Sequence, residues 1–290
     1  MFDRLCPRPH LLLPGLAAAA LAACGLTTEV APTPTRAVGE VNSPLSDYNL
    51  SESADGQRRV WARSKANFAG AHILESQRGP GGWSEPRELP FSDTRWRDSD
   101  PWLTPDGRTL YFVSDRPVPA RPDGHDLNIW RAGLGPEGWG RPEPLGDEVN
   151  SPAEELGPEL HGGRLYFGSN RPGGLGGLDL YAAEQRDGGF ASAQPLPAPV
   201  NSAASEGDPT FSPDGRTLVF WRLIDRQLVL HRTERSGGGW TEPVALPGRF
   251  SFGAMQITPA FSPDGRSLRF ASTPGAGPTA LFDVYETAWP

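Results

Sequence analysis

An acidic side chain recurs at a fixed place along this 290-residue chain, three residues before a proline in three of its copies. The aligned positions, in chain order, are Asp47, Asp98, Glu155, Glu206 and Gln256. One such position per repeat predicts a ring of four carboxylates and one amide at one mouth of a central channel. Oxygen donors of this kind suit Ca²⁺ better than zinc. They also suit basic or polyhydroxylated ligands.

The same pattern has a structural alternative. Asp and Glu side chains often accept backbone N–H bonds from a neighbouring loop, and a repeated fold repeats such a contact in every copy. Two further carboxylates, Asp100 and Asp208, lie next to the recurring proline, but in two copies only. The sequence favours the structural role for the acidic positions and leaves the binding role open.

Motifs of several common catalytic sites are missing. The five histidines show no spacing typical of zinc ligands, and no Gly-x-Ser-x-Gly nucleophile turn occurs. The glycines at 173–177 lie in a predicted hairpin loop, whereas a phosphate-binding loop joins a strand to a helix. A formal net charge of −8 without a basic patch argues against a nucleic-acid partner. We therefore expect no cofactor, with Ca²⁺ as the one candidate.

The first 23 residues have the pattern of a bacterial signal peptide. Arg4 and Arg8 precede an apolar stretch at 11–23, which is too short for a comfortable membrane-spanning helix. Small residues then precede Cys24, as in the lipobox of bacterial lipoproteins, in which the Cys is lipidated and becomes the mature N-terminus. The alternative is a plain signal peptide with an incidental Cys. After cleavage Cys24 would have no disulfide partner, which favours lipidation.

A tether follows the proposed lipid site. Residues 24–35 are rich in Thr and Pro, and they would give a domain at 36–290 slack above the membrane. In the lipoproteins that this segment resembles, an Asp after the Cys favours the inner membrane, and Gly25 stands here instead. We expect a monomer on the outer membrane, facing the periplasm or the cell surface, that contacts the membrane through the lipid only.

About five copies of a roughly 50-residue repeat fill the remaining chain. Each copy centres on a Ser-Pro-Asp-Gly turn, in which Pro presets φ, Asp bonds its own backbone and Gly takes a positive φ. Apolar runs on both sides of each turn predict a β-hairpin. The turns begin at Ser53, Thr104, His161, Ser212 and Ser262, of which the first and third are weaker copies.

Two further elements recur in phase and complete a four-stranded unit. A third strand follows each hairpin, and Trp83, Trp139 and Trp240 each introduce a short fourth strand. We expect these tryptophans to pack within the blades. Four short antiparallel strands per copy predict an all-β fold, a five-bladed β-propeller.

Several third strands carry an aspartate at or near their start. We expect these aspartates to form ion pairs within their own blades, with arginines that follow the second strands. The aspartates are Asp126, Asp179 and Asp283, and the arginines are Arg116 and Arg171.

The last copy lacks a fourth strand, and the N-terminal end supplies a candidate for it. Residues 39–44 closely match residues 147–152, which end the second copy. We predict that about residues 36–43 complete the last blade, because closing the ring removes the exposed edges of an open array. A sixth blade would need a copy with no recognisable turn.

The phased combination of motifs resembles a known repeat. The Ser-Pro-Asp-Gly turns, the Ser-Asp/Asn-Arg-Pro segments at 114–117 and 169–172, and Asp-Leu-Tyr at 179–181 resemble the WD40-like repeats of TolB-type periplasmic proteins. Similar repeats occur in envelope proteins with OmpA-like domains. The resemblance covers nearly all of residues 36–290 and implies the propeller fold, which does not specify function. Neither the N-terminal domain of TolB nor an OmpA-like domain is recognised, so their partners are not carried over.

Two functions are compatible with this sequence. The first is a non-catalytic cell-envelope lipoprotein whose propeller binds a protein or a glycan. The second is a carbohydrate-active enzyme, a glycosidase or lyase, in which two carboxylates about 5–9.5 Å apart act at the channel mouth. Its candidate carboxylates are Asp47, Asp98, Glu155 and Glu206. The Ser-Pro-Asp-Gly repeat is untypical of propeller glycosidases, so we favour the first function and assign no catalytic or metal-binding residue.

Overall fold

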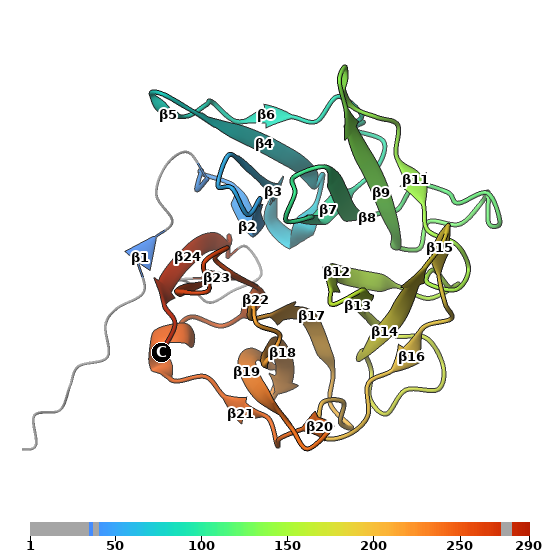
Figure 1. The fold of residues 1–290 in the computed structure, drawn as a ribbon, viewed down its shortest axis with the longest axis vertical. Helices are drawn as coiled ribbons and strands as arrows, with labels where there is room; N and C mark the ends of the chain where they lie inside the picture. The colour runs from blue at the N-terminus through green and yellow to red at the C-terminus, as the bar shows by residue number, and fades with distance from the viewer. Residues whose placement is uncertain (1–34, 37–40, 274–279) are drawn as a thin grey trace, which may run out of the picture. The chain divides into compact units, whose positions relative to one another are not determined.

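The computed structural model describes residues 35–36, 41–273 and 280–290. These residues form five antiparallel β-sheets arranged as blades around a centre (Figure 1), which confirms the predicted five-bladed β-propeller. Two short 3-10 helices, η1 (Ala66–Phe68) and η2 (Gly248–Phe250), lie between strands. No helix within the described ranges is long and apolar enough to cross a membrane.

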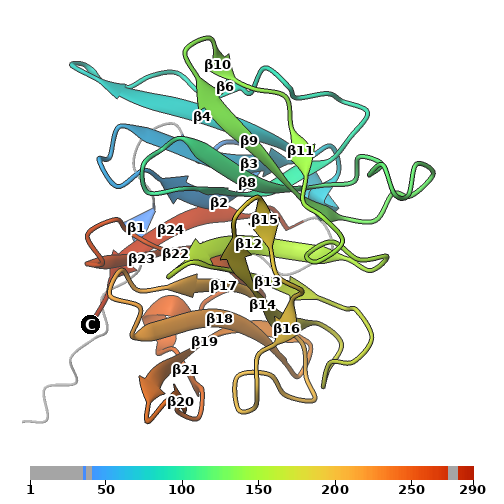
Figure 2. The same ribbon diagram turned by 45° about the vertical axis from the view of Figure 1, so that its right-hand side comes forward.

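Each blade repeats one order of strands, and Figure 2 shows the blades in an oblique view. The innermost strands are β2 (Ser46–Glu52), β7 (Asp98–Leu103), β12 (Glu155–His161), β17 (Glu206–Phe211) and β22 (Gln256–Phe261). The second strands are β3 (Arg58–Ser64), β8 (Thr109–Ser114), β13 (Arg164–Ser169), β18 (Thr217–Ile224) and β23 (Ser267–Ser272). The third strands are β4 (His72–Gly79), β9 (Asn128–Gly135), β14 (Asp179–Arg186), β19 (Gln227–Ser236) and β24 (Asp283–Ala288).

In four blades the outer strand consists of two short pieces, both paired with the third strand. A proline lies between the pieces in three of these blades, where its missing N–H interrupts the ladder. The first pieces are β5 (Gly82–Trp83), β10 (Gly138–Trp139), β15 (Gly189–Phe190) and β20 (Gly239–Trp240). The second pieces are β6 (Arg87–Glu88), β11 (Glu143–Pro144), β16 (Gln194–Pro195) and β21 (Val244–Ala245).

The Ser-Pro-Asp-Gly turns form as the sequence predicts, and the turn between β7 and β8 is typical. The Thr104 hydroxyl donates to the Asp106 carboxylate at 2.6 Å and accepts the backbone N–H of Thr109 at 2.9 Å. The same carboxylate accepts the N–H of Arg108 at 3.0 Å. Gly107 has a φ of +68°, which side chains disfavour. The side chains of the turn therefore satisfy the backbone groups that the hairpin leaves open.

The core lies between the blades. Both faces of each second strand are covered, because each face packs against a neighbouring blade. Strand β8 shows this arrangement most simply. Leu110 and Phe112 pack with residues of the first blade, whereas Tyr111 and Val113 pack with residues of the third. Alternate side chains of one strand point to opposite faces, so each second strand joins two interfaces. This double burial explains why these strands read as continuous apolar runs.

The three tryptophans of the outer strands lie within or against the blades. Trp139 is buried, and its indole N–H donates to the Glu75 carboxylate of the first blade at 3.1 Å. The Arg59 guanidinium lies 4.3 Å from the Trp83 ring centroid, and that of Arg235 lies 4.5 Å from the ring of Trp240. These contacts agree with the predicted packing role.

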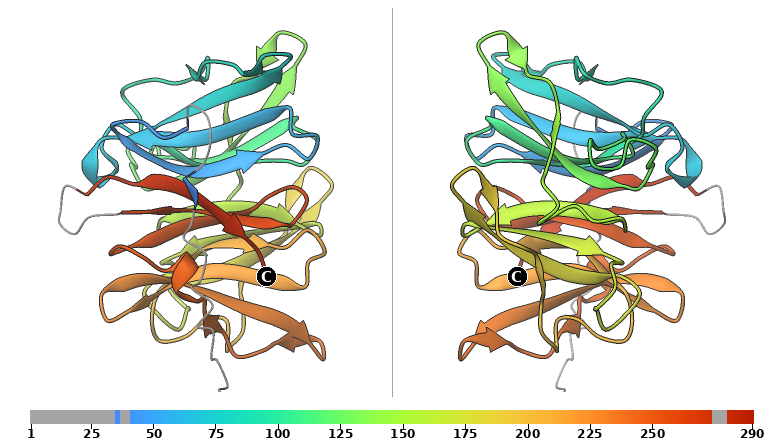
Figure 3. Two further views of the ribbon diagram at one scale, coloured as in Figure 1. Left: turned by 90° about the vertical axis from the view of Figure 1, so that its left-hand side faces the viewer. Right: turned by 90° about the vertical axis from the view of Figure 1, so that its right-hand side faces the viewer.

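The N-terminal segment closes the ring, as predicted. Strand β1 (Thr35–Arg36) pairs antiparallel with β24 and becomes the outer strand of the last blade. The views in Figure 3 show this C-terminal blade beside the first blade. The closing strand is shorter than the expected range of about 36–43, since residues 41–43 follow it as a loop and residues 37–40 lie outside the described residues.

The loop at 41–43 contains Asn42, which binds the third strand of the last blade. The Asn42 amide accepts the Val284 N–H at 2.7 Å and donates to the Val284 carbonyl at 3.0 Å. Asn150 makes the same two bonds with Ile129, at 2.8 and 3.0 Å. The repeated Val-Asn-Ser sequence is therefore an anchor that follows the fourth strand, and Asn42 makes this contact across the closure.

We expect Asn42→Ala to lower the free energy of unfolding by about 1–3 kcal/mol, because the Val284 N–H loses its acceptor inside the blade. Urea denaturation of the full-length chain measures this effect. The control is Glu137→Ala at an exposed site, which should change stability by less than about 0.5 kcal/mol. Equal effects of the two substitutions would show that the Asn42 contact does not hold the ring closed.

Candidate functional site

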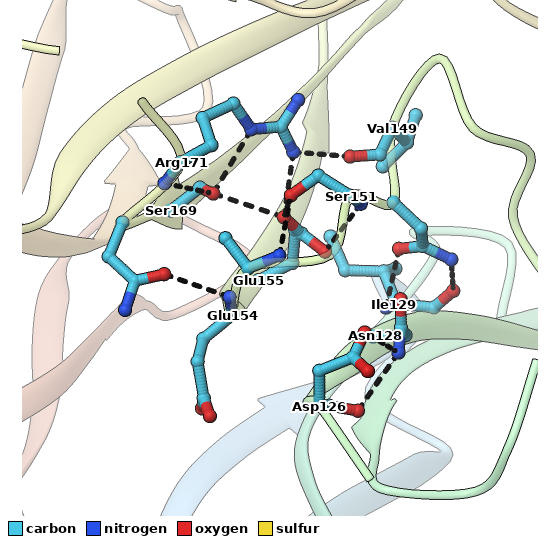
Figure 4. Close-up of polar contacts among 12 residues, drawn as sticks. Asp126, Asn128, Ile129, Val149, Ser151, Glu154, Glu155, Ser169 and Arg171 are labelled. Carbon is cyan, nitrogen blue, oxygen red and sulfur yellow. Dashed lines mark hydrogen bonds and ion pairs between the residues drawn. The ribbon is translucent and has the colours of Figure 1, made fainter. Parts of the chain in front are cut away.

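The five predicted ring positions occupy one level of the propeller, each near the start of an innermost strand. All five side chains are buried, with at most 2% of their surface exposed. Each carboxylate is enclosed by donors of its own blade. In the third blade, drawn in Figure 4, Glu155 accepts the Ser151 N–H at 3.0 Å and the hydroxyls of Ser151 and Ser169 at 2.6 and 3.0 Å.

An arginine completes each of the four carboxylate sites. The Arg171 guanidinium lies 2.8 Å from the Glu155 carboxylate and also donates to the Val149 carbonyl (Figure 4). The pairing repeats in the other three blades that have a carboxylate. The pairs are Arg63 with Asp47 at 2.7 Å, Arg116 with Asp98 at 2.5 Å, Arg171 with Glu155 at 2.8 Å and Arg222 with Glu206 at 2.8 Å.

Each arginine also fixes the loop that leads into its blade. Besides Val149, the carbonyls of Val41, Phe91 and Val200 accept from the paired arginines, at 3.0, 3.0 and 2.9 Å. We call this repeated unit of carboxylate, arginine and loop carbonyl the arginine lock. It connects three segments. These are the innermost strand, the arginine in or just after the second strand, and the last segment of the preceding blade.

The arginine reaches the lock from two different sequence positions. Arg63 and Arg222 lie directly opposite Asp47 and Glu206 in the strand register. In the second and third blades a serine stands opposite, and the arginine lies two residues further along the chain. This difference hides the lock in the sequence, because the arginines do not align between copies.

The fifth blade has no lock. Gln256 lies opposite Ser272, and its amide donates to the Phe252 carbonyl at 2.7 Å. A neutral side chain fits there because no arginine is paired with it among the described residues. The ring position therefore carries a carboxylate in the four blades that supply a lock arginine, and an amide in the blade where none is paired with it.

These contacts agree with the structural alternative for the acidic positions. Asp47, Glu155 and Glu206 each accept a loop N–H, as a cap does, and all four carboxylates are occupied by donors. Burial raises the pKa of Asp98 and of Glu155, while their arginines oppose this shift. The locks therefore fix geometry more than they add stability. The four carboxylates are buried and already accept bonds from protein donors.

The expected pairs of Arg116 and Arg171 with third-strand aspartates are wrong. Both arginines belong to locks, and Asp126 pairs instead with Arg121 at 3.1 Å. Asp179 accepts the Gly176 N–H at 3.0 Å.

A second level of side chains lines the channel itself. Every innermost strand has a bulge two residues after the ring position. The residue there has a φ between +49° and +56° in all five blades. Such a bulge turns the side chain toward the channel. The five residues are Asn49, Asp100, Gly157, Asp208 and Thr258.

Bonds between blades connect this level. Asp100 accepts the Gly157 N–H at 3.1 Å, and Asp208 accepts the Thr258 N–H at 3.0 Å. The Thr258 hydroxyl accepts the Asn49 N–H at 3.1 Å. A Cβ at Gly157 would lie 2.5 Å from the Asp208 carboxylate, so only glycine fits between the two aspartates.

Neither Asp100 nor Asp208 forms an ion pair with an arginine within the described ranges. Burial raises the pKa of Asp100, while the charge of Arg97 opposes this shift, and burial together with the charge of Asp100 raises the pKa of Asp208 to about 7. Both side chains are half-buried, and Asp208 lines a cavity of about 30 Å³, which is the space of one water molecule. The sequence shows these two Asp-Pro sites in phase, but only the bulge reveals that they face the channel.

The channel widens at the end where the Ser-Pro-Asp-Gly turns lie. There a pocket of about 420 Å³ takes lining residues from all five blades, and we call it the mouth pocket. Aromatic and proline side chains dominate it, together with Glu159 of β12. The aromatic residues are Trp102, His161, Phe211 and Phe261, and the prolines are Pro105, Pro213 and Pro263.

Glu159 lies between the channel cavity and the mouth pocket, because it lines both. Its carboxylate accepts the Phe211 N–H at 2.8 Å. Burial raises the pKa of Glu159 to about 7, while this bond and those from Thr210 and Trp102 oppose the shift. The sequence did not single out Glu159, because no other copy has an acid at its place. In the part of the chain that the structure describes, no three His, Cys, Asp or Glu residues are grouped to hold a metal ion.

The locks predict that opposite substitutions in the fourth and fifth blades both destabilise the protein. We expect Glu206→Gln to lower the free energy of unfolding by about 3–5 kcal/mol, because it leaves the buried Arg222 charge without its partner. Gln256→Glu places a carboxylate where no lock arginine exists, and it should also destabilise the protein, by about 2–4 kcal/mol. Urea denaturation measures both. If Glu206→Gln costs no more than Glu137→Gln at an exposed site, the lock does not hold the blade.

Comparisons with known proteins identify the fold. No protein-family model and no curated protein match the chain. Among solved structures, TolB from Acinetobacter baumannii matches 84% of this chain and 54% of its own, with 14% identity and a TM-score of 0.52. The chain thus spans about half the length of TolB.

Two glycoside hydrolases match over nearly their whole length. An α-L-arabinofuranosidase from Lactobacillus brevis has 13% identity, covers 85% of this chain and 92% of its own, and gives a TM-score of 0.57. A thermostable family-43 glycoside hydrolase has 13% identity, coverage of 86% and 91%, and a TM-score of 0.56. Identities this low show the fold alone. In fold, the chain is a TolB-like five-bladed β-propeller.

Proposed function

We propose that this protein is a non-catalytic cell-envelope lipoprotein whose propeller is a scaffold that binds a protein or a glycan in the mouth pocket. The observation that carries the proposal is that residues of all five blades line this one pocket of about 420 Å³. Its size is within the range of ligand sites, which are usually concave and mostly apolar with few polar groups. The TolB-like fold is compatible with such a scaffold.

The rigidity of the surrounding structure supports this role. The Leu103 N–H donates to the Ser51 hydroxyl at 2.9 Å across the first two blades, and the Phe211 N–H donates to Glu159 across the third and fourth. The walls of the mouth pocket are thus held before a ligand arrives, and a preorganised site loses less entropy on binding.

The cellular location is part of the proposal and rests on the sequence. Cys24 lies outside the described residues, as does the signal peptide at 1–23. We propose lipidation at Cys24, including palmitate, and anchorage to the outer membrane as a monomer that faces the periplasm or the cell surface. The described propeller then reaches its partner without any other contact with the membrane.

Site-specific crosslinking tests the binding proposal. A photoreactive amino acid at exposed Ala54, which lines the mouth pocket, should give adducts with an envelope protein or glycan in cells. The matched control is the same amino acid at Leu175, which is 60% exposed on a loop between β13 and β14. Adducts at Leu175 without adducts at Ala54 would contradict a ligand site in the mouth pocket.

Metabolic labelling tests the anchor. We expect a palmitate analogue to label the wild-type chain, and Cys24→Ser to abolish the label and release the protein from the membrane fraction. Cys6→Ser serves as the control, since Cys6 lies within the predicted signal peptide and should leave labelling intact. Retention of the label in Cys24→Ser would show that the lipid is attached elsewhere.

A second candidate is a carbohydrate-active enzyme, and Asp100 and Asp208 are the observation that favours it. Both carboxylates contact Gly157, and neither forms an ion pair with an arginine within the described ranges, unlike the four lock carboxylates. The glycoside hydrolases of similar fold add support. The cavity of about 30 Å³ that Asp208 lines is too small for a sugar ring, so this candidate requires the channel to open.

Turnover of aryl arabinofuranosides tests the second candidate. If the protein is such an enzyme, Asp100→Asn and Asp208→Asn should each lower kcat by at least about a hundredfold, whereas Asp264→Asn in an exposed turn should not. We expect no turnover by the wild-type chain. Turnover that depends on both aspartates would replace the scaffold proposal with the enzyme.

A further inference from the structure

One carboxylate of the mouth pocket differs from the acids at the lock positions. Glu159 lies four residues after the lock carboxylate Glu155, and the aligned residues of the other blades are not acidic. They are Ser51, Trp102, Thr210 and Ala260, which also line the mouth pocket. The acid at Glu159 is therefore not required by the repeat.

The contacts of Glu159 are all neutral in the part of the chain that the structure describes. Its donors are the Phe211 N–H, the Thr210 hydroxyl and the Trp102 indole. Glu159 forms no ion pair within the described ranges. Only 8% of its surface is exposed. A buried carboxylate with no cation is costly, and the fold avoids this cost at the four locks by supplying an arginine.

The other charges of the mouth pocket do not supply that cation. The Arg269 guanidinium is already paired with two carboxylates, Glu52 at 2.8 Å and Glu286 at 3.2 Å. Burial, followed by the charge of Arg235, lowers the pKa of His161, so its ring is neutral near pH 7. Asp208 adds a second carboxylate nearby and no cation. Burial raises the pKa of Glu159 to about 7, so its carboxylate is partly ionised near neutral pH, and no cation of the described pocket residues compensates that charge.

The walls above Glu159 suit a flat cation. Trp102 and Phe261 line the pocket, and the His161 ring stacks on Phe211 with centroids 4.7 Å apart and planes at 14°. A guanidinium stacks on such rings while it binds a carboxylate, and it is less strongly hydrated than an ammonium. Charge and shape together favour arginine over lysine.

We propose that the mouth pocket recognises an arginine side chain of a partner polypeptide, whose guanidinium pairs with Glu159. The inference rests on the proposed function and names its ligand class. The incoming arginine would compensate the charge of the Glu159 carboxylate, as the arginines of the locks compensate the four lock carboxylates. A neutral glycan would leave the Glu159 carboxylate without a cation, which is why the charge favours a basic peptide. The net charge of −8 also favours approach of a basic segment.

Calorimetric titration with a pair of blocked peptides tests this inference. The probes are acetyl-Gly-Gly-Arg-Gly-Gly-amide and the same peptide with citrulline, which keeps the shape of arginine without its charge. We expect the arginine peptide to bind the wild-type chain at least about tenfold more tightly, which corresponds to about 1.4 kcal/mol. Glu159→Gln keeps an oxygen for the Phe211 N–H and should abolish the preference. Glu137→Gln, at an exposed site, should retain it.

Each outcome decides the inference. Equal binding of the two peptides by the wild-type chain, or no binding of either, overturns it without any need for the variant to fold. Preference retained in folded Glu159→Gln also overturns it, as does tight binding of a neutral oligosaccharide that depends on the same pocket. Adducts at Ala54 together with no arginine preference would leave the binding scaffold standing and refute only the ligand class.

Discussion

The burial of both faces of every blade is the constraint on which the rest of this structure depends. A second strand such as β8 packs against two different blades, so a blade at the end of an open array would expose one apolar face. The chain meets this constraint by closing on itself. Strand β1 joins β24, and Asn42 binds Val284 as its counterparts bind other third strands. An N-terminal segment and a C-terminal strand thereby share one blade.

A closed ring must also hold its blades at fixed angles, and the arginine locks do this at the start of the innermost strands. A lock such as Arg171 with Glu155 and the Val149 carbonyl joins three segments through charge-assisted bonds. Since burial penalises the carboxylate, the gain lies in geometry rather than in net stability. In the fifth blade a neutral hydrogen bond from Gln256 to the Phe252 carbonyl stands in place of the ion pair.

Departures from the repeat are concentrated along the channel. Bulges turn one residue per blade inward, and at this level the five side chains differ in charge and size. Asp100, Asp208 and Glu159 form no ion pair with an arginine in the part of the chain that the structure describes, whereas the locks one level away are paired. The lock carboxylates recur in four blades because the fold repeats. Asp208 and Glu159, which do not recur in this way, line the cavities, where a ligand would contact them.

The sequence alone determined the all-β class, the five blades, the turn chemistry and the closure by an N-terminal segment. These features are local or periodic, so a turn of four residues or a repeated Val-Asn-Ser is visible without coordinates. The tertiary structure decided which carboxylates are structural. Asp98 and Asp100 are two residues apart, yet one is locked by Arg116 and the other faces the channel, because a bulge separates them. The Glu159 site likewise needs five blades brought together, and no single repeat encodes a pocket that all five must line.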